Sequence, residues 1–218
     1  RTGQYVEGYL EALGREIAAC RGLYRRLKSV YIGGGTPLVL EPYRLRRVLE
    51  ALSPFAEGGV EYTVEAGRPD VFTPEKLELL REFGVTRICV TVHTLCLKKG
   101  ARLKEEEDRL EGAGVSEMIA YARSALSAAG YEPYYLYRQK YMAGNNENTG
   151  WCRPGTACVY NIDVMEEIAD NIACGANAVG KKLFEGGARI ERVGAPKDIP
   201  TYIKKIDEII ADKRKLYG

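Results

Sequence analysis

The alternation of helix and strand patterns over residues 6–94 constrains the fold more than any other feature of the sequence. Apolar residues recur at helical spacing over 6–17 and again from residue 45 to 52, and short apolar strands lie at 29–32, 61–66 and 87–94. The first of these strands ends in three consecutive glycines. Strands that alternate with helices form βα units on a parallel sheet. We therefore expect an α/β fold.

The pattern changes after Gly130, which ends a helix predicted from about residue 116. Four further elements are predicted: an aromatic-rich strand at 133–141, a helix at 164–174, a hairpin at 181–193 that turns at Gly186-Gly187, and a last helix from about residue 200. We therefore place a boundary there. Residues 1–130 are expected to form an incomplete parallel β/α barrel, and residues 131–218 a C-terminal α+β accessory domain.

Charge and cysteine usage limit the classes of partner and compartment. The 218 residues contain 32 Lys and Arg against 30 Asp and Glu, so the net charge of +2 gives no argument for a nucleic-acid or acidic-membrane partner. No apolar run approaches the ~20 residues of a membrane span. None of the six cysteines forms a CxxC pair, and a secreted disulfide framework normally occurs in a shorter chain. We expect a cytoplasmic protein.

The glycine run at 33–35, followed by Thr36 and Pro37, stands at the C-terminal end of a strand, where α/β folds bind ligands. Three glycines let the backbone approach a ligand closely. The run is neither a phosphate-binding Walker loop nor a dinucleotide fingerprint, because no Gly-Lys-Ser/Thr follows and no helix begins directly after it. Backbone carbonyls suit an ammonium group. The alternative is a plain glycine-rich turn.

Glu65 also ends a strand, and a carboxylate at that edge needs a hydrogen-bond donor. Ribose hydroxyls or an ammonium group would serve, and so would a structural pair with Arg68 or Arg87. The residues at 134–140 place tyrosines beside two cations, which suits a flat anionic ligand. The alternative there is an edge strand whose tyrosines pack half-buried.

Metal-binding patterns are weak. His93 is the only histidine, which excludes a site built on several histidines and favours a core or rim position. Cys152 and Cys158 have a spacing that matches no common zinc pattern.

Six motifs together carry a resemblance to a known family. They are YIGGGTP at 31–37, TVEAGRPD at 63–70, TVHT at 91–94, PYYLYRQK at 133–140, GNNEN at 144–148 and CVYN at 158–161. The chain resembles the oxygen-independent coproporphyrinogen III oxidase family of radical S-adenosylmethionine enzymes, and within it the coproporphyrinogen dehydrogenase, HemZ-like branch.

The resemblance implies an anaerobic oxidoreductase of porphyrin and heme biosynthesis. In the family, a partial β/α barrel binds a 4Fe-4S cluster and S-adenosylmethionine. A 5′-deoxyadenosyl radical takes a hydrogen from a tetrapyrrole propionate, which loses carbon dioxide and becomes a vinyl group. The implied electron donor is a flavodoxin or ferredoxin. The alternatives are a haem-binding chaperone without decarboxylase activity and a cofactor-free scaffold.

The resemblance also implies roles for individual residues. The residues that match its cofactor-contacting motifs are Gly34, Gly35, Thr36 and Glu65. Those expected at the tetrapyrrole are Tyr135, Tyr137, Arg138 and Lys140. No catalytic residue and no metal ligand is assigned in this chain.

The chain departs from the family in two ways. The CxxxCxxC motif that holds the cluster is absent from the 218 residues and is expected before Arg1, so the chain alone is predicted to be inactive. The barrel is also too short, because roughly six βα units of about 30 residues need on the order of 180 residues. Two motifs of different family strands are adjacent here, which predicts a missing segment between Val90 and Thr91.

Overall fold

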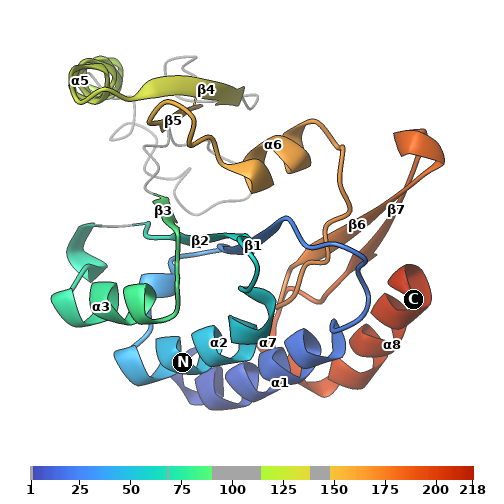
Figure 1. Cartoon of the computed structure of the whole chain (residues 1–218). Helices are drawn as coiled ribbons and strands as arrows, with labels where there is room; N and C mark the ends of the chain where they lie inside the picture. The colour runs from blue at the N-terminus through green and yellow to red at the C-terminus, as the bar shows by residue number, and fades with distance from the viewer. Residues whose placement is uncertain (1, 68, 90–113, 138–147) are drawn as a thin grey trace. The chain divides into compact units, whose positions relative to one another are not determined.

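The computed structural model of the chain describes residues 2–67, 69–89, 114–137 and 148–218. Contacts divide the chain into two compact units (Figure 1). The first unit combines Arg1–Val90 with Val159–Gly218, and the second unit is Thr91–Cys158. This division differs from the boundary expected near Gly130, because the C-terminal segment packs against the N-terminal helix of the first unit.

Three parallel strands form the sheet of the first unit: β1 (Ser29–Ile32), β2 (Glu61–Glu65) and β3 (Arg87–Cys89). Their order is β1-β2-β3, and both pairs are parallel. The expected mixed α/β fold with a parallel sheet is therefore confirmed. Closure into a partial barrel stays a prediction.

Helices α1 (Val6–Ala19), α2 (Pro42–Leu52) and α3 (Pro74–Glu82) lie on one side of this sheet (Figure 1). The apolar faces of α2 and α3 provide Leu45, Leu49 and Leu80 to the core, and β2 provides Tyr62 and Val64. These five side chains are at most 2% exposed. The helical spacing of the apolar residues therefore placed this core correctly.

The opposite face of the sheet is polar. Side chains alternate between the faces of a strand, so Glu61, Thr63 and Glu65 point away from the side chains of Tyr62 and Val64. A helix from the C-terminal segment, α6 (Val159–Met165), lies on this side (Figure 1). The face that carries Glu65 is therefore partly covered by a segment remote in sequence.

The rest of the C-terminal segment forms a hairpin and two helices. The hairpin pairs β6 (Val179–Phe184) with β7 (Arg189–Gly194), which confirms the predicted turn at Gly186-Gly187. Helices α7 (Ile199–Lys204) and α8 (Ile206–Tyr217) follow and contact α1. Their apolar side chains Tyr202, Ile206 and Ile209 form a second core with Ala12 of α1.

Short 3-10 turns connect several of these elements. They are η1 (Thr2–Tyr5), η2 (Pro37–Val39), η3 (Ser53–Phe55), η4 (Pro69–Val71) and η7 (Glu185–Gly187). No helix in the described ranges is long and apolar enough to cross a membrane.

The helix predicted at 164–174 is wrong. Helix α6 ends at Met165, and Glu167 then adopts a φ of 50°, which helices do not contain. Asn171 pairs with Lys181 through two backbone hydrogen bonds of 2.8 Å. The backbone of this segment therefore extends the edge of the hairpin instead of forming a helix.

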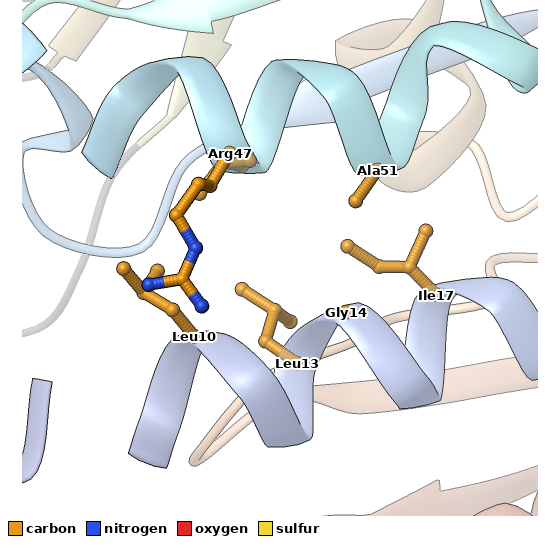
Figure 2. A pocket seen from close by; sticks show the side chains of 7 residues that line it. Leu10, Leu13, Gly14, Ile17, Arg47 and Ala51 are labelled. Atoms are coloured by element: carbon orange, nitrogen blue, oxygen red, sulfur yellow. The ribbon is translucent and has the colours of Figure 1, made fainter. Parts of the chain in front are cut away.

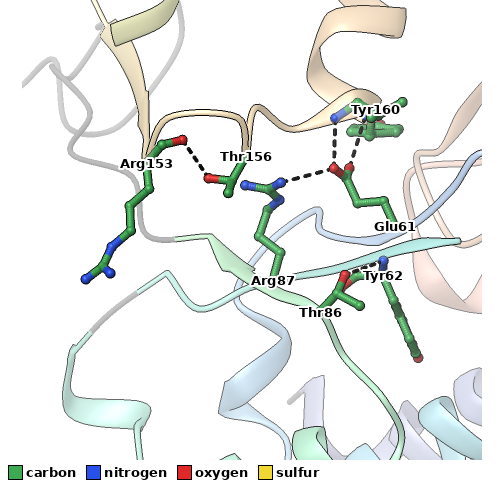
Figure 3. Close-up of polar contacts among 8 residues, drawn as sticks. Glu61, Tyr62, Thr86, Arg87, Arg153, Thr156 and Tyr160 are labelled. Atoms are coloured by element: carbon green, nitrogen blue, oxygen red, sulfur yellow. Dashed lines mark hydrogen bonds and ion pairs between the residues drawn. The ribbon is translucent and has the colours of Figure 1, made fainter. Parts of the chain in front are cut away.

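The second unit contains α5 (Val115–Ala128) and an antiparallel pair of strands, β4 (Glu132–Tyr137) and β5 (Asn148–Cys152). The predicted helix and the start of the predicted strand are thus confirmed, while the end of that strand lies outside the described residues. Helix α5 buries none of its side chains, and Tyr121 is 77% exposed. Thr156 donates a hydrogen bond to the carbonyl of Arg153 (Figure 3).

Candidate functional site

The candidate site lies where β1 and β2 end in the first unit. Ile32 and Val64 are partners in the parallel register, so the loop at 33–36 and Glu65 leave the sheet at the same edge. Ligands of open α/β sheets bind at this carboxyl edge. The sequence predicted this juxtaposition, and the contacts below describe it.

Gly33 is where the glycine loop meets Glu65. A Cβ atom at this position would lie 2.9 Å from Cδ of Glu65 and 2.6 Å from a ring carbon of Tyr31. Real Cβ contacts are not this short, so only glycine lets the Glu65 side chain lie across the loop.

Among the described residues, no side chain packs against the next two glycines, Gly34 and Gly35, at the position where a Cβ atom would lie. Gly34 and Gly35 adopt positive φ angles of 78° and 117°, which side chains other than glycine rarely tolerate. A Cβ atom at either position would meet no heavy atom within 4 Å. Both glycines are exposed, and the space where a side chain would lie is empty in the described part of the structure.

Thr36 locks this loop to the loop that follows β2. A Cβ atom at Gly67 would lie 2.5 Å from the hydroxyl oxygen of Thr36, so the glycine makes room for the threonine side chain. The YIGGGTP and TVEAGRPD motifs thus pack directly against each other. This contact gives Thr36 a structural role, in addition to the cofactor contact that the resemblance implies.

Tyr31 is the hydrogen-bond donor to Glu65 that the sequence reasoning missed. Its hydroxyl donates to Oε1 of Glu65 at 2.5 Å. Of the arginines considered as partners, Arg87 pairs with Glu61 at 3.2 Å, and Arg68 lies outside the described residues. The alternation of side chains along a strand could have revealed this contact. Tyr31 pairs with Thr63 in register, and Thr63 shares a face with Glu65, so Tyr31 and Glu65 lie on the same face of the sheet.

Tyr160 from α6 stacks on Tyr31. The two ring centroids are 4.0 Å apart and the rings are inclined by 17°. Tyr31 is thereby held between a carboxylate and an aromatic ring. The CVYN motif, which contains Tyr160, is therefore part of the same site as the glycine loop.

Glu61 fixes the start of α6 above the sheet (Figure 3). Its two carboxylate oxygens accept the backbone N–H groups of Val159 at 2.9 Å and Tyr160 at 3.3 Å. Further along α6, Asp163 pairs with Lys28 at 3.2 Å. Periodicity along the sequence could not reveal these contacts, because they join residues 98 to 135 positions apart.

The residues expected to contact a tetrapyrrole belong to β4 of the second unit or follow it. The Tyr135 ring packs over Gly150, where a Cβ atom would lie 1.9 Å from a ring carbon, and it makes an edge contact with Tyr134 at 4.9 Å. Tyr137 ends β4 and pairs in register with Asn148. The packing of Tyr135 fits the half-buried edge strand that was the alternative.

Several other predictions fall on residues that the structure does not describe. They concern Arg138 and Lys140, the expected break between Val90 and Thr91, and the position of His93. All of these lie outside the described residues and stay predictions.

The described part of the chain offers no metal site with three or more His, Cys, Asp or Glu ligands. A small hollow lies between α1 and α2, lined by Leu10, Leu13, Ile17, Arg47 and Ala51 among others (Figure 2). Its volume of about 10 Å³ has room for a single water molecule. This hollow is too small for an organic ligand.

Comparison with known proteins bears on the family. The chain is 26% identical to the oxygen-independent coproporphyrinogen-III oxidase-like protein HemZ of Bacillus subtilis (strain 168) over 264 aligned positions, which cover 87% of this chain and 53% of HemZ. This confirms the resemblance to the HemZ-like family. The match extends through both units of the chain.

Two heme chaperones are also similar to the chain over shorter stretches. HemW of Lactococcus lactis subsp. lactis (strain IL1403) is 36% identical over 124 residues, which cover 52% of this chain and 32% of that protein. HemW of Bacillus subtilis (strain 168) is 34% identical over 114 residues, covering 48% and 30%. No family model matches the chain. No solved structure matches it either.

The lengths of these matches show how much of each relative the chain covers. It spans about half the length of HemZ and about a third of each HemW. Because 87% of 218 residues is about 190, about 74 of the 264 positions aligned with HemZ face gaps in this chain.

Proposed function

We propose that the HemZ-like protein containing this chain binds S-adenosylmethionine at the carboxyl edge of β1 and β2. The observation that carries the proposal is the convergence of an open glycine backbone with a carboxylate. Glu65 lies against Gly33, next to the two glycines whose backbone is uncovered. Such a carboxylate accepts hydrogen bonds from ribose hydroxyls or from an ammonium group. Backbone carbonyls likewise accept hydrogen bonds from the methionine ammonium group.

The residues of the chain have separate tasks in this site. Gly34 and Gly35 present backbone groups to the methionine end, and Glu65 accepts hydrogen bonds from the cofactor. Tyr31 orients the Glu65 carboxylate through its hydroxyl. Bound S-adenosylmethionine supplies a 5′-deoxyadenosyl group.

The residues present do not fit an iron–sulfur cluster. The sequence contains no CxxxCxxC spacing, and the described cysteines do not gather with other ligands into a site of three or more. We therefore assign no step of radical chemistry to this chain. We propose that residues outside these 218 bind a 4Fe-4S cluster in the whole protein, and we expect the chain alone to be inactive.

The reaction proposed for the whole protein is oxidative decarboxylation of a propionate on a tetrapyrrole of the coproporphyrinogen III type. It rests on the similarity to HemZ. A flavodoxin or ferredoxin would donate electrons in the cytoplasm, and Tyr135, Tyr137, Arg138 and Lys140 are the proposed substrate contacts. The HemW relatives favour a second candidate, a haem chaperone without decarboxylase activity.

The proposed domain organisation is an interrupted barrel over residues 1–130 and an accessory domain over 131–218. A missing segment between Val90 and Thr91 is part of this proposal, and about 74 positions of the alignment with HemZ face gaps in this chain. The missing segment is supported by the boundary between the two units, which falls between the same two residues.

The binding proposal predicts the effect of Glu65→Ala in the full-length, cluster-loaded protein. Loss of one hydrogen bond to a charged acceptor is worth roughly 1.5 to 3 kcal/mol, so the affinity for S-adenosylmethionine should fall about ten- to a hundredfold. Anaerobic equilibrium dialysis with labelled S-adenosylmethionine measures this. Glu57→Ala, at an exposed carboxylate before β2, is the matched control and should leave the affinity unchanged. Equal affinities for the two variants would refute the role of Glu65.

A second experiment separates the two candidate functions. The full-length protein is incubated with coproporphyrinogen III under anaerobic reducing conditions, and in parallel with haem. Formation of vinyl groups identifies a decarboxylase, whereas stable haem uptake without new vinyl groups identifies a chaperone. Absence of S-adenosylmethionine binding to the cluster-loaded protein would instead favour a cofactor-free scaffold.

A further inference from the structure

Two cysteines that are distant in sequence meet in the first unit. The sulfur atoms of Cys20 and Cys174 are 3.5 Å apart, although 154 residues separate them. Cys20 is the residue at which α1 ends, and Cys174 lies in the segment that leads into β6. Cys20 is only 6% exposed, so the contact is part of the packed interior.

A buried polar network fixes both cysteine-bearing segments. Glu16, one helical turn before Cys20, is fully buried and pairs with Lys213 at 2.9 Å. The other carboxylate oxygen of Glu16 accepts the backbone N–H of Gly175, directly after Cys174, at 2.8 Å. One carboxylate thus connects the cysteine on α1 to the segment that carries its partner. The contacts of Glu16 with Gly175 and Lys213 therefore hold the two thiols close to each other.

The two thiols have different acidities. The hydrogen bond between the two thiols lowers the pKa of Cys20, while burial acts in the opposite direction. The hydrogen bond with Cys20 and burial together raise the pKa of Cys174. Cys20 is therefore the thiol that ionises first, and a thiolate is the nucleophilic form of cysteine.

We propose that Cys20 and Cys174 form a redox-modification site at which a peroxide converts the two thiols into a disulfide. The Cys20 thiolate attacks one oxygen of hydrogen peroxide, the O–O bond breaks and hydroxide leaves, which makes a sulfenic acid on Cys20. The sulfur of Cys174 then attacks the Cys20 sulfur, and the S–O bond breaks with loss of water. In sum, two thiols are oxidised and one peroxide is reduced to two waters.

The local backbone permits this bond. A disulfide has an S–S length of about 2.05 Å, so the sulfurs must approach each other by about 1.5 Å. Cys20 follows the last turn of α1, and Cys174 precedes Gly175, whose φ is 109°. Neither residue lies inside a regular helix or strand, so small backbone and side-chain rotations can close the gap. Cys174 is of intermediate exposure, so the pair is not sealed from solvent.

The disulfide would join the end of α1 to the segment before the hairpin. It would tie the C-terminal half of the first unit covalently to its N-terminal helix. Cross-links that close long loops typically stabilise a protein by restricting the unfolded chain, which here corresponds to a rise of roughly 5 to 15 °C in melting temperature.

The test uses the reduced 218-residue chain, treated with a small excess of hydrogen peroxide and digested without reductant. Peptide mapping by mass spectrometry should find a cross-linked peptide that contains Cys20 and Cys174, and the melting temperature should rise and return after reduction. Cys89→Ser, at a thiol outside the pair, should still form the cross-link, whereas Cys174→Ser should not and should accumulate an oxidised Cys20.

The wild-type chain alone can overturn the proposal. If peroxide leaves both thiols free, or oxidises them without a cross-link while other cysteines react, the pair is not a disulfide-forming site. A cross-link that joins Cys20 to a cysteine other than Cys174 has the same consequence. Because these readouts come from the wild type, the result does not depend on whether a serine variant folds. The proposal is also independent of S-adenosylmethionine binding.

Discussion

At the scale of single residues, the candidate site depends on Glu65 and on the three residues that surround it or its partner: Gly33, Tyr31 and Tyr160. Gly33 gives the Glu65 carboxylate a place to lie, and Tyr31 donates a hydrogen bond to it. Tyr160 then packs on Tyr31. A carboxylate with a fixed direction loses less entropy when it accepts a ligand, so we expect Tyr31 to act through Glu65 and not through a ligand contact of its own.

Tyr31→Phe tests this positioning role. The phenyl ring can still stack on Tyr160, while the hydrogen bond to Glu65 is lost. Because a net hydrogen bond is worth about 1 kcal/mol, the affinity of the cluster-loaded protein for S-adenosylmethionine should fall about three- to tenfold. Equilibrium dialysis measures it, with Tyr43→Phe, at a tyrosine 56% exposed, as the control.

The double variant separates positioning from an independent contact. If Tyr31 acts through Glu65, Tyr31→Phe combined with Glu65→Ala should bind no more weakly than Glu65→Ala alone. Full additivity of the two losses would show that Tyr31 does not act by positioning Glu65.

At the scale of elements, α6 is the helix that the site needs and that the sequence did not predict. It is seven residues long, and short isolated helices are marginal in water. Its stability must come from tertiary contacts, chiefly Glu61 at its first N–H groups and the Lys28–Asp163 pair. A sequence pattern that relies on periodicity has little to detect in a helix of this length.

Glu61→Ala should therefore release α6. Removing a side-chain acceptor at a helix start costs about 1 to 2 kcal/mol, so amide hydrogen exchange over residues 159–165 should accelerate about five- to thirtyfold. Exchange in α2 should not change. Glu57→Ala, four residues earlier and exposed, is the control. If exchange in α6 stays at the control rate, contacts other than Glu61 hold the helix.

The elements that the sequence predicted well are those whose stability is visible in one stretch of chain. Helices α1 and α2 follow from apolar residues at helical spacing, and strands β1, β2 and β3 follow from the short apolar runs after them. The 164–174 region failed because its decisive interaction is a pairing of Asn171 with Lys181. The same holds for the candidate site. The sequence predicted that the glycine loop and Glu65 share one edge of the sheet, but it did not predict the contacts of Tyr31 with Glu65 and with Tyr160.

At the scale of the whole molecule, the first unit is built from both ends of the chain. Residues 159–218 complete the structure of residues 1–90, so the core of this unit joins segments that are far apart in sequence. Local patterns along the sequence give no information about such a return. The contact that specifies the return most strongly is the buried pair of Glu16 on α1 and Lys213 on α8.

Lys213→Met tests how far this pair holds the two ends of the chain together. Lys213 and Glu16 are 3% and 0% exposed, and Tyr202 also donates a hydrogen bond to the same carboxylate. Removing one partner of a buried ion pair leaves an uncompensated charge, which costs about 3 to 5 kcal/mol of the free energy of unfolding. Urea unfolding of the 218-residue chain measures the loss. The control is Lys215→Met, at an exposed lysine two residues after Lys213, which should change the free energy of unfolding by less than about 0.5 kcal/mol.

The double variant Glu16→Gln with Lys213→Met shows whether the cost arises from the stranded charge. A neutral amide oxygen at residue 16 can still accept from Tyr202 and Gly175, so the double variant should recover much of the stability that Lys213→Met loses. If the double variant is instead as unstable as the single variant, the cost does not arise from the stranded charge of Glu16. If Lys213→Met is no less stable than Lys215→Met, the pair does not hold α8 on α1, and the apolar contacts of Tyr202, Ile206 and Ile209 must do so.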